Sequence, residues 1–332
     1  MKILVAVPGH LHTVPMSRFV PDAAATLGHE VSVADYSLTL AEKLASRLLK
    51  ESSAQQAVAP RLLRAIEAAR PDLFLTLYGA NIGAQVLAAL RKRGVVTANW
   101  WLNDPFQLER GAQILPGYDF AFTNARHSVE AYAALGLKSV HFLPTACEPA
   151  VHKPLGERAS VCDISFAGDW SLAREQLIGA LLRAGLDLRV FGPWRRKLAK
   201  DSPLRARLEH GFFSPQRMAE IFAACKATLN IHTWRGRFDH GLNPRVFEAG
   251  ACGVPQLVDH KRELDEIFDP AQRAGMLIYR DDEELLRLAR KAIEDAVEMR
   301  GRALEASASF RRDHSYRARI AELLRVVGGA AT

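Results

Sequence analysis

Short apolar runs alternate with longer stretches of helical periodicity along the whole chain, and this alternation limits the fold more than any other feature. Each apolar run is long enough for one buried strand, and each intervening stretch is long enough for a helix that covers it. Strand–helix alternation of this kind is typical of doubly wound domains with parallel sheets. We therefore predict the α/β fold class.

Strands and helices are expected in regular succession through the first half of the chain. The strands fall at residues 2–7, 30–34, 73–78, 95–100, 120–123 and 140–144. The helices fall at residues 16–27, 39–69, 81–93 and 127–135. A polar segment that contains two prolines follows at residues 148–159, and we place a linker there.

The same succession begins again after this linker. Its strands are expected at residues 162–166, 187–191, 227–232, 255–258 and 276–279. Its helices are expected at residues 171–184, 215–225, 244–252, 261–268 and 282–307. The 332 residues therefore predict two Rossmann-like domains, 1–150 and 156–310, facing each other across a cleft. A last helix at 314–327 is expected to brace the first domain.

Composition and charge argue against several classes of protein. Apolar residues make up 48% of the chain and charged residues 24%, as in an ordinary globular protein. The formal charge of +7 is spread along the chain, so nucleic-acid binding is not expected. The basic clusters Arg195–Lys197 and Arg311–Arg312 allow at most peripheral contact with a membrane. The first residues lack the pattern of a signal peptide and the four cysteines are scattered, which together indicate the cytoplasm.

The segment Gly241–Gly253 carries the clearest functional pattern. Asn243 is a favourable N-cap and Pro244 a favourable first residue, so a helix should start here with its free N–H groups forming an anion site. Arg245 can place two donors on phosphate oxygens. Glu248 shares a face with Arg245 and can accept from the two hydroxyls of a ribose. The pattern predicts a nucleoside-diphosphate pocket, and the alternative is a surface ion pair on a capped helix.

Two segments of the first half follow predicted strands and could supply a base. His12 lies with His10 in the loop after the first strand, where it could act as a general base, ligate a metal or simply be solvated. Asp104 follows the pair Trp100–Trp101 at the carboxyl end of the fourth strand, the end that faces the ligand in doubly wound sheets. The alternative for Asp104 is a helix N-cap.

The second half places further candidates at the carboxyl ends of its strands. Gly168 permits a tight turn after the first of them, and Asp169 and Arg174 follow, the arginine within reach of a bound phosphate. Phe213 could frame a flat base, and His232 closes the strand ahead of the predicted anion site. As alternatives, Asp169 is a turn residue and Phe213 a core residue.

The order of these motifs resembles the donor domain of GT-B glycosyltransferases, and more narrowly the CgeB-like family, which has spore-coat and flagellin-modifying members. An Asn-x-Arg-x-Phe-Glu helix is matched by residues 243–248. A Trp-x-x-Asp-x-Pro element resembles residues 100–105, and a terminal His-x-Tyr-x-x-Arg resembles residues 314–319. Many retaining GT-B enzymes carry an earlier glutamate where this chain has His240.

This resemblance implies a glycosyltransferase of the hexosyltransferase type. It would move a sugar from a UDP-sugar or dTDP-sugar to a hydroxyl of a protein, glycan or small molecule. It would use no metal and no other cofactor. A first-domain base, His12 or Asp104, would activate the acceptor. The donor-binding residues would be Gly168, Asp169, Arg174, Phe213, His232, Asn243, Arg245 and Glu248. A sugar-nucleotide epimerase of the same architecture and a two-lobed sugar-binding protein are the alternatives.

Overall fold

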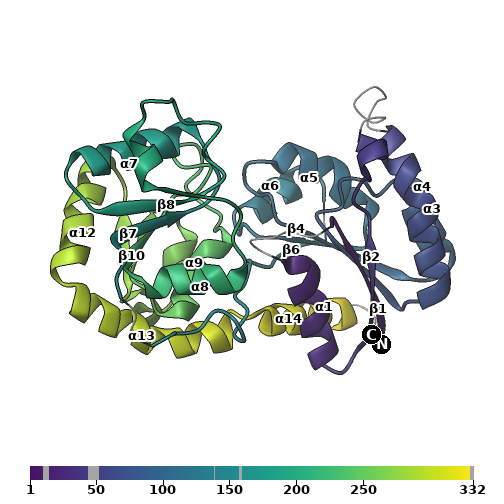
Figure 1. Ribbon diagram of the computed structural model, residues 1–332. Coiled ribbons are helices and arrows are strands. Elements are labelled where there is room, and N and C mark those ends of the chain that lie inside the picture. The colour runs from purple at the N-terminus through teal and green to yellow at the C-terminus, as the bar shows by residue number, and fades with distance from the viewer. Residues whose placement is uncertain (10–14, 44–51, 138, 157–158, 330–332) are drawn as a thin grey trace. The chain divides into compact units, whose positions relative to one another are not determined.

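The computed structural model describes residues 1–9, 15–43, 52–137, 139–156 and 159–329. The chain divides into two compact units (Figure 1). The first contains the described residues up to Pro144 together with the C-terminal helix from Tyr316, and the second contains Thr145–Ser315. The boundary therefore lies ahead of the polar segment in which the sequence places a linker.

The first unit is built on a parallel sheet in the order β2-β1-β3-β4-β5-β6. Its strands are β1 (Lys2–Val7), β2 (Glu30–Asp35), β3 (Leu73–Leu77), β4 (Val96–Trp101), β5 (Phe120–Thr123) and β6 (Val140–Phe142). Its described helices are α1 (Met16–Thr26), α3 (Ser52–Ala69), α4 (Ala84–Lys92), α5 (Leu108–Ile114), α6 (Ser128–Ala134) and α14 (Tyr316–Gly329). The central strands β1 and β3 are apolar and buried on both faces, as helices on both sides of a parallel sheet require.

Helix α14 completes the first unit, although it comes from the far end of the chain. It packs against α1, beside which it lies in Figure 1. Tyr316 at its start is fully buried, with its ring 5.4 Å from that of Phe19 and 6.5 Å from that of Trp100. These aromatic contacts give α14 a fixed place in this core.

The second unit is built on a parallel sheet in the order β12-β11-β10-β7-β8-β9. Its strands are β7 (Cys162–Ala167), β8 (Leu188–Gly192), β9 (Leu208–His210), β10 (Cys225–Asn230), β11 (Gln256–Asp259) and β12 (Met276–Tyr279). Its described helices are α7 (Leu172–Arg183), α8 (Pro215–Ala223), α9 (Pro244–Cys252), α10 (Glu263–Ile267), α11 (Pro270–Arg273), α12 (Asp282–Glu294) and α13 (Ala296–Asp313). Two sheets with flanking helices confirm the predicted α/β class.

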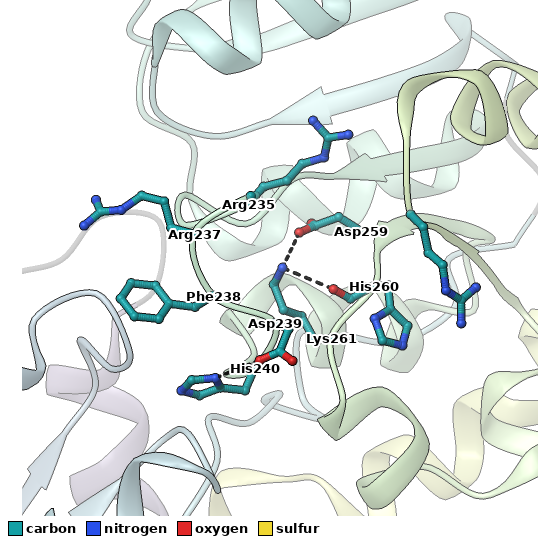
Figure 2. Close-up of a pocket in the computed structure, with 10 residues that line it drawn as sticks. Arg235, Arg237, Phe238, Asp239, His240, Asp259, His260 and Lys261 are labelled. Carbon is teal, nitrogen blue, oxygen red and sulfur yellow. Dashed lines mark hydrogen bonds and ion pairs between the residues drawn. The ribbon is translucent and has the colours of Figure 1, made fainter. Parts of the chain in front are cut away.

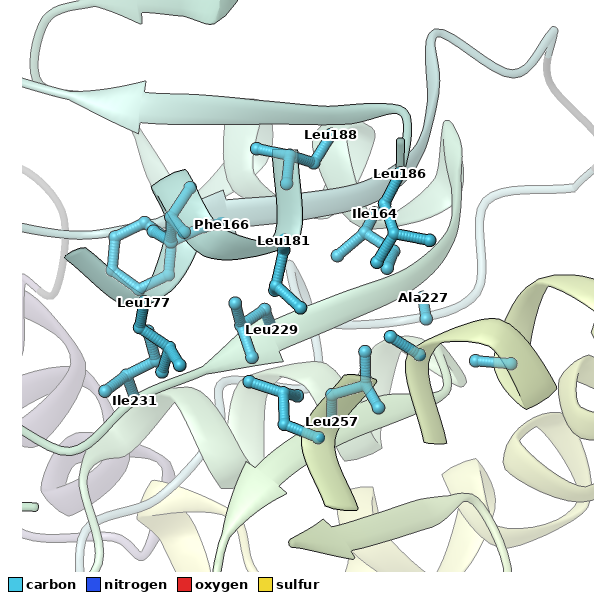
Figure 3. Packing of buried hydrophobic residues seen from close by; sticks show 14 of the residues in the cluster. Ile164, Phe166, Leu177, Leu181, Leu186, Leu188, Ala227, Leu229, Ile231 and Leu257 are labelled. Carbon is cyan, nitrogen blue, oxygen red and sulfur yellow. The ribbon is translucent and has the colours of Figure 1, made fainter. Parts of the chain in front are cut away.

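The cores of the second unit lie on the two faces of its sheet. On one face, side chains of β7, β8 and β10 such as Ile164 and Leu229 pack with Leu177 and Leu181 of α7 (Figure 3). On the other face, α9 packs against α13, with Phe247 and Phe310 in one buried cluster. The sheet is thereby held rigidly from both sides.

The structure corrects the expected helix at 282–307, which is two helices. Leu285 and Leu288 of α12 belong to the core on the α7 face, whereas α13 contacts α9 and α11 on the opposite face. One straight helix cannot cover both faces, so the chain turns at Asp295 between them. Helix α5 and strand β9 were not predicted, because segments this short carry little readable periodicity. No helix in the described part of the chain is long and apolar enough to cross a membrane.

The contact between α9 and α13 yields a stability test. A Cβ added at Gly250 of α9 would lie 2.6 Å from the ring of Phe310, so Gly250→Ala should overpack this core and lower the free energy of unfolding by about 1–3 kcal/mol. Gly301→Ala is the matched control, because a Cβ there meets nothing within 4 Å. It should raise stability by about 0.5–1 kcal/mol, the usual gain for alanine within a helix. Urea unfolding followed by circular dichroism measures both, and equal effects would contradict the packing described.

Candidate functional site

The strand order of the second sheet reverses between β7 and β10. From β7 the chain moves outward through β8 to β9, and from β10 it moves outward in the other direction through β11 to β12. Loops that leave the carboxyl ends of strands at such a reversal diverge and open a crevice, which is where ligands bind in doubly wound folds. The loop after β7 begins at Gly168, and the loop after β10 leads through residues 231–243 to α9.

A pocket of about 170 Å³ lies at this edge of the sheet. It is lined by four of the residues that the sequence singles out, namely Gly168, Asp169, Phe213 and Arg245. The phenylalanine is held by an edge-to-face contact with Phe191, whose ring centroid lies 5.9 Å away. The pocket therefore combines a backbone turn, an aromatic wall and a cation.

Gly192, at the end of β8, gives this pocket its shape. A Cβ at Gly192 would lie 2.2 Å from the carbonyl oxygen of Gly168, so only glycine lets the two loops approach this closely. Trp194 donates from Nε1 to the same carbonyl oxygen at 2.8 Å and fixes the turn. A close approach of this kind, between loops far apart in the chain, leaves no local signal in the sequence.

Arg245 and Glu248 form a buried ion pair on the first turns of α9. Nη1 of Arg245 donates to Oε2 of Glu248, in the i,i+3 arrangement that puts both side chains on one face of the helix. Arg245 lines the pocket, whereas Glu248 is only 1% exposed and contacts the arginine from the buried side. The second carboxylate oxygen, Oε1, has no hydrogen-bond partner among the described residues. A buried acceptor without a donor destabilises the folded state, so a ligand that donates a hydrogen bond to this oxygen would remove that cost.

Asn243 occupies the N-cap position of α9 but does not cap the helix with its side chain. Its side chain exchanges hydrogen bonds with Asn230 at the end of β10, at 2.7 Å and 3.1 Å. No described side chain accepts from the first turn of α9 in its place. Asn243 thus bonds to Asn230 instead of capping the helix, and the backbone N–H of Arg245 receives no cap from its side chain.

Arg174 connects the two loops that leave the crevice. Its guanidinium donates to the carbonyl oxygens of Asp169 at 2.9 Å and Ile231 at 2.5 Å, and to the hydroxyl of Thr233 at 3.2 Å. The side chain is buried, so its donors face protein oxygens rather than open space. Arg174 therefore positions both loops in this structure, and the direct phosphate contact expected for it stays a prediction.

His232 belongs to a buried chain of charges rather than to the pocket wall. Its Nδ1 lies 2.8 Å from Oδ1 of Asp259, whose Oδ2 accepts from Nζ of Lys261 at 2.7 Å (Figure 2 shows the lysine). Burial alone would raise the pKa of Asp259, but His232 and Lys261 together hold it well below its ordinary value. Nε2 of His232 has no hydrogen-bond partner among the described residues. Nδ1 of His232 is thus engaged by Asp259, and the donor contact predicted for His232 stays a prediction.

His152 is a neighbour of the ion pair that the sequence prediction missed. It lies in the segment expected to be a linker, is buried, and accepts at Nδ1 from the backbone N–H of Glu148 at 2.9 Å. Burial lowers the pKa of His152, while the charge of Glu248 acts in the opposite direction, which places the ring close to this carboxylate. Burial is the larger of these effects, so the neutral form of the imidazole is favoured.

The two bases expected in the first unit have different outcomes. His12 lies outside the described residues, and so does His10. Asp104 is fully buried, and its carboxylate accepts from the hydroxyl of Thr123 at 2.5 Å and from that of Tyr132 at 3.0 Å. An acceptor hydroxyl cannot reach either oxygen in this conformation, so the role of Asp104 as a base stays a prediction that the geometry does not support.

Substitution of Asp104 by asparagine tests the cost of this buried carboxyl. Burial raises the pKa of Asp104 from its ordinary 3.8 to about 6, so the folded state holds this proton more tightly than the unfolded state does. Its contribution to stability is therefore greatest below about pH 4 and falls, by roughly 3 kcal/mol, as the pH rises to about 6. Asp104→Asn removes this titration. The difference in free energy of unfolding between wild type and variant should change by that amount over this range, and a constant difference would count against the buried ionised carboxylate.

Comparison with known proteins agrees with this geometry. Residues 174–325 match the model of a family described as glycosyl transferase-like, and no curated protein is significantly similar in sequence. The structure is similar to sucrose-phosphate synthase from Thermosynechococcus elongatus, with a TM-score of 0.74 and 12% identity over 99% of this chain and 100% of that one. It is similar to Anabaena Alr3699/HepE in complex with UDP, with a TM-score of 0.66 and 13% identity over 99% and 100%. A proposed UDP-N-acetylglucosamine 2-epimerase from Listeria monocytogenes gives a TM-score of 0.58 and 13% identity over 97% and 95%.

Likeness at these identities shows the fold and nothing finer. The narrower resemblance to CgeB-like proteins stays a prediction. The fold predicted from the sequence is confirmed, because two parallel six-stranded sheets with flanking helices match GT-B structures along nearly the whole chain. The chain thus has the GT-B fold, and its residues 174–325 match the model of a glycosyl transferase-like family.

Proposed function

We propose that this protein is a glycosyltransferase that moves a hexose from a UDP-sugar to an acceptor hydroxyl without a metal ion. The observation that carries the proposal is the buried pair of Arg245 and Glu248 at the start of α9, beside the pocket of Gly168 and Phe213. The family match over residues 174–325 and the UDP bound by the similar Anabaena protein support it.

Each residue of the ion pair would contact a different part of the donor when the donor binds. The diphosphate offers Arg245 oxygens that can replace those of Glu248, and a guanidinium binds phosphate in the same forked geometry as a carboxylate. Glu248 is then released to accept from the ribose hydroxyls. Its unpartnered Oε1 already lacks a donor, so this exchange removes an existing cost rather than creating one.

The start of α9 would also assist the chemical step. Breaking the bond between sugar and diphosphate leaves additional negative charge on the leaving group. Arg245 and the N–H groups of the uncapped first turn stand where this charge develops, and such fixed donors stabilise it more in the transition state than in the ground state. This arrangement supplies the role that a divalent cation has in other transferases, and so we propose metal-independent transfer.

The acceptor is the second substrate of the proposed reaction. We propose that it binds the first unit and presents a hydroxyl of a protein, a glycan or a small molecule, with His12 as the remaining candidate base. The epimerase alternative shares the fold, but the family match favours transfer to an acceptor. No contact in the structure favours the sugar-binding protein.

Binding of free nucleotides tests the donor class. UDP should stabilise the folded protein more than dTDP, GDP or CDP in thermal unfolding, because a ligand that binds only the native state adds stability in proportion to the logarithm of its saturation. At about one hundred times its dissociation constant UDP should contribute roughly 2.7 kcal/mol. A panel in which no nucleoside diphosphate shifts the midpoint would remove the proposal.

Glu248→Gln tests the exchange of partners. The neutral amide is a weaker acceptor for ribose hydroxyls, so UDP affinity measured by calorimetry should fall by about 10–100-fold. Stability should also fall, because Arg245 loses its charged partner, so UDP affinity is compared under conditions in which the variant is folded. Glu220→Gln is the matched control, since Glu220 forms an i,i+3 pair with Arg217 at 3.1 Å on the solvent-facing side of α8. Equal UDP affinity in wild type and Glu248→Gln would show that the ribose contact is assigned to the wrong residue.

A further inference from the structure

A second and larger pocket, of about 420 Å³, lies at the carboxyl ends of β10, β11 and β12. Its walls are the loop 235–240, the segment 259–261 and Arg280, which follows β12 (Figure 2). The loop 235–240 leads directly into the start of α9. This pocket therefore lies on the β11 side of the reversal in strand order, and the smaller pocket lies on the β8 side.

The walls of this second pocket carry a surplus of positive charge. Four lining residues are Lys or Arg and two are Asp, namely Arg235, Arg237, Lys261 and Arg280 against Asp239 and Asp259. Some of these charges are neutralised by ion pairs. Lys261 pairs with Asp259 at 2.7 Å, and Arg235 pairs with Asp282 outside the pocket at 2.6 Å.

Two cations remain after this pairing. Asp239 is engaged by Arg262 at 3.1 Å, so it does not neutralise an arginine of the pocket wall. Arg237 and Arg280 have no carboxylate partner in the part of the chain that the structure describes. The side chain of Arg237 makes a cation–π contact, with its guanidinium carbon 5.6 Å from the ring centroid of Phe238. The pocket lining thus includes two arginines without a carboxylate partner among the described residues, one in the loop 235–240 and one directly after β12.

The order of the pockets along the sheet edge indicates which part of a donor each would hold. A nucleoside in the smaller pocket would lie on the β8 side of the sheet edge. A diphosphate at the start of α9 would lie next to it, in the direction of β11. The glycosyl group is the next part of the molecule, and the next cavity in that direction is the pocket of Arg237 and Arg280.

We propose that this pocket selects a donor whose sugar carries a carboxylate, that is, a nucleoside-diphosphate uronic acid. The inference rests on the proposed function and adds the class of sugar. A neutral hexose offers these guanidinium groups only hydroxyls, whereas a carboxylate complements their charge and matches the fork of an arginine with two parallel hydrogen bonds. Arg237 and Arg280 are then specificity-determining residues of the donor site.

Calorimetric titrations with UDP, UDP-glucose and UDP-glucuronate test this assignment. The acid should bind wild type roughly tenfold or more tightly than UDP-glucose, and the advantage should shrink at high salt because both arginines are exposed. UDP alone reports on the nucleotide site without involving the second pocket, and it is the reference for every variant.

Arg237→Gln, Arg280→Gln and the double variant locate the selectivity. Each should reduce the preference for UDP-glucuronate over UDP-glucose, and the double variant should abolish it, while UDP affinity stays at the wild-type value. Arg290→Gln is the matched control, because Arg290 is an exposed arginine of α12 that does not line the pocket. It should change none of the three affinities.

Three results would overturn the inference while leaving the proposed function intact. The first is equal affinity of wild type for the two UDP-sugars, and the second is a preference that survives in the double variant. The third is loss of UDP binding itself in the double variant, since it would make the arginines diphosphate ligands. Failure of wild type to bind UDP at all would instead remove the proposed function and the inference together.

Discussion

The reversal of strand order between β7 and β10 determines where every donor-site candidate of the second unit lies. It brings the end of one strand beside the end of another that is remote in sequence, and it leaves a crevice between their loops. The guanidinium of Arg174 then joins these loops through the carbonyl oxygens of Asp169 and Ile231. These contacts add to the pairing of β7 with β10 in fixing the pocket relative to the start of α9.

A second theme is polar groups that the protein leaves without a full set of partners. Oε1 of Glu248, the first turn of α9 and the guanidinium groups of Arg237 and Arg280 all belong to the second unit, and each is a site where binding can supply what folding did not. Arg245 links the first turn of α9, on which it lies, to the carboxylate of Glu248. It lines the smaller pocket and pairs with that carboxylate from the pocket side. Native cores tolerate few buried polar atoms without a partner, so the position of Oε1 of Glu248 directly behind a pocket-lining arginine indicates function.

Most of the architecture could be predicted from the sequence, since buried strands and the helices between them leave periodic patterns. The site could be predicted only as far as its local motifs reach. The spacing of Arg245 and Glu248 on one helix is local, and their contact follows from it. The pairing of Asn243 with Asn230, the burial of Asp104 by Thr123 and Tyr132, and the position of His152 depend on segments far apart in the chain, for which one sequence holds no signal.

The placement of α14 has a consequence for biosynthesis. Helix α14 is translated after residues 145–315, yet its Tyr316 packs inside the core of a unit whose sheet is translated before them. The nascent first unit must therefore hold the surface around Phe19 and Trp100 exposed while residues 145–315 are being made.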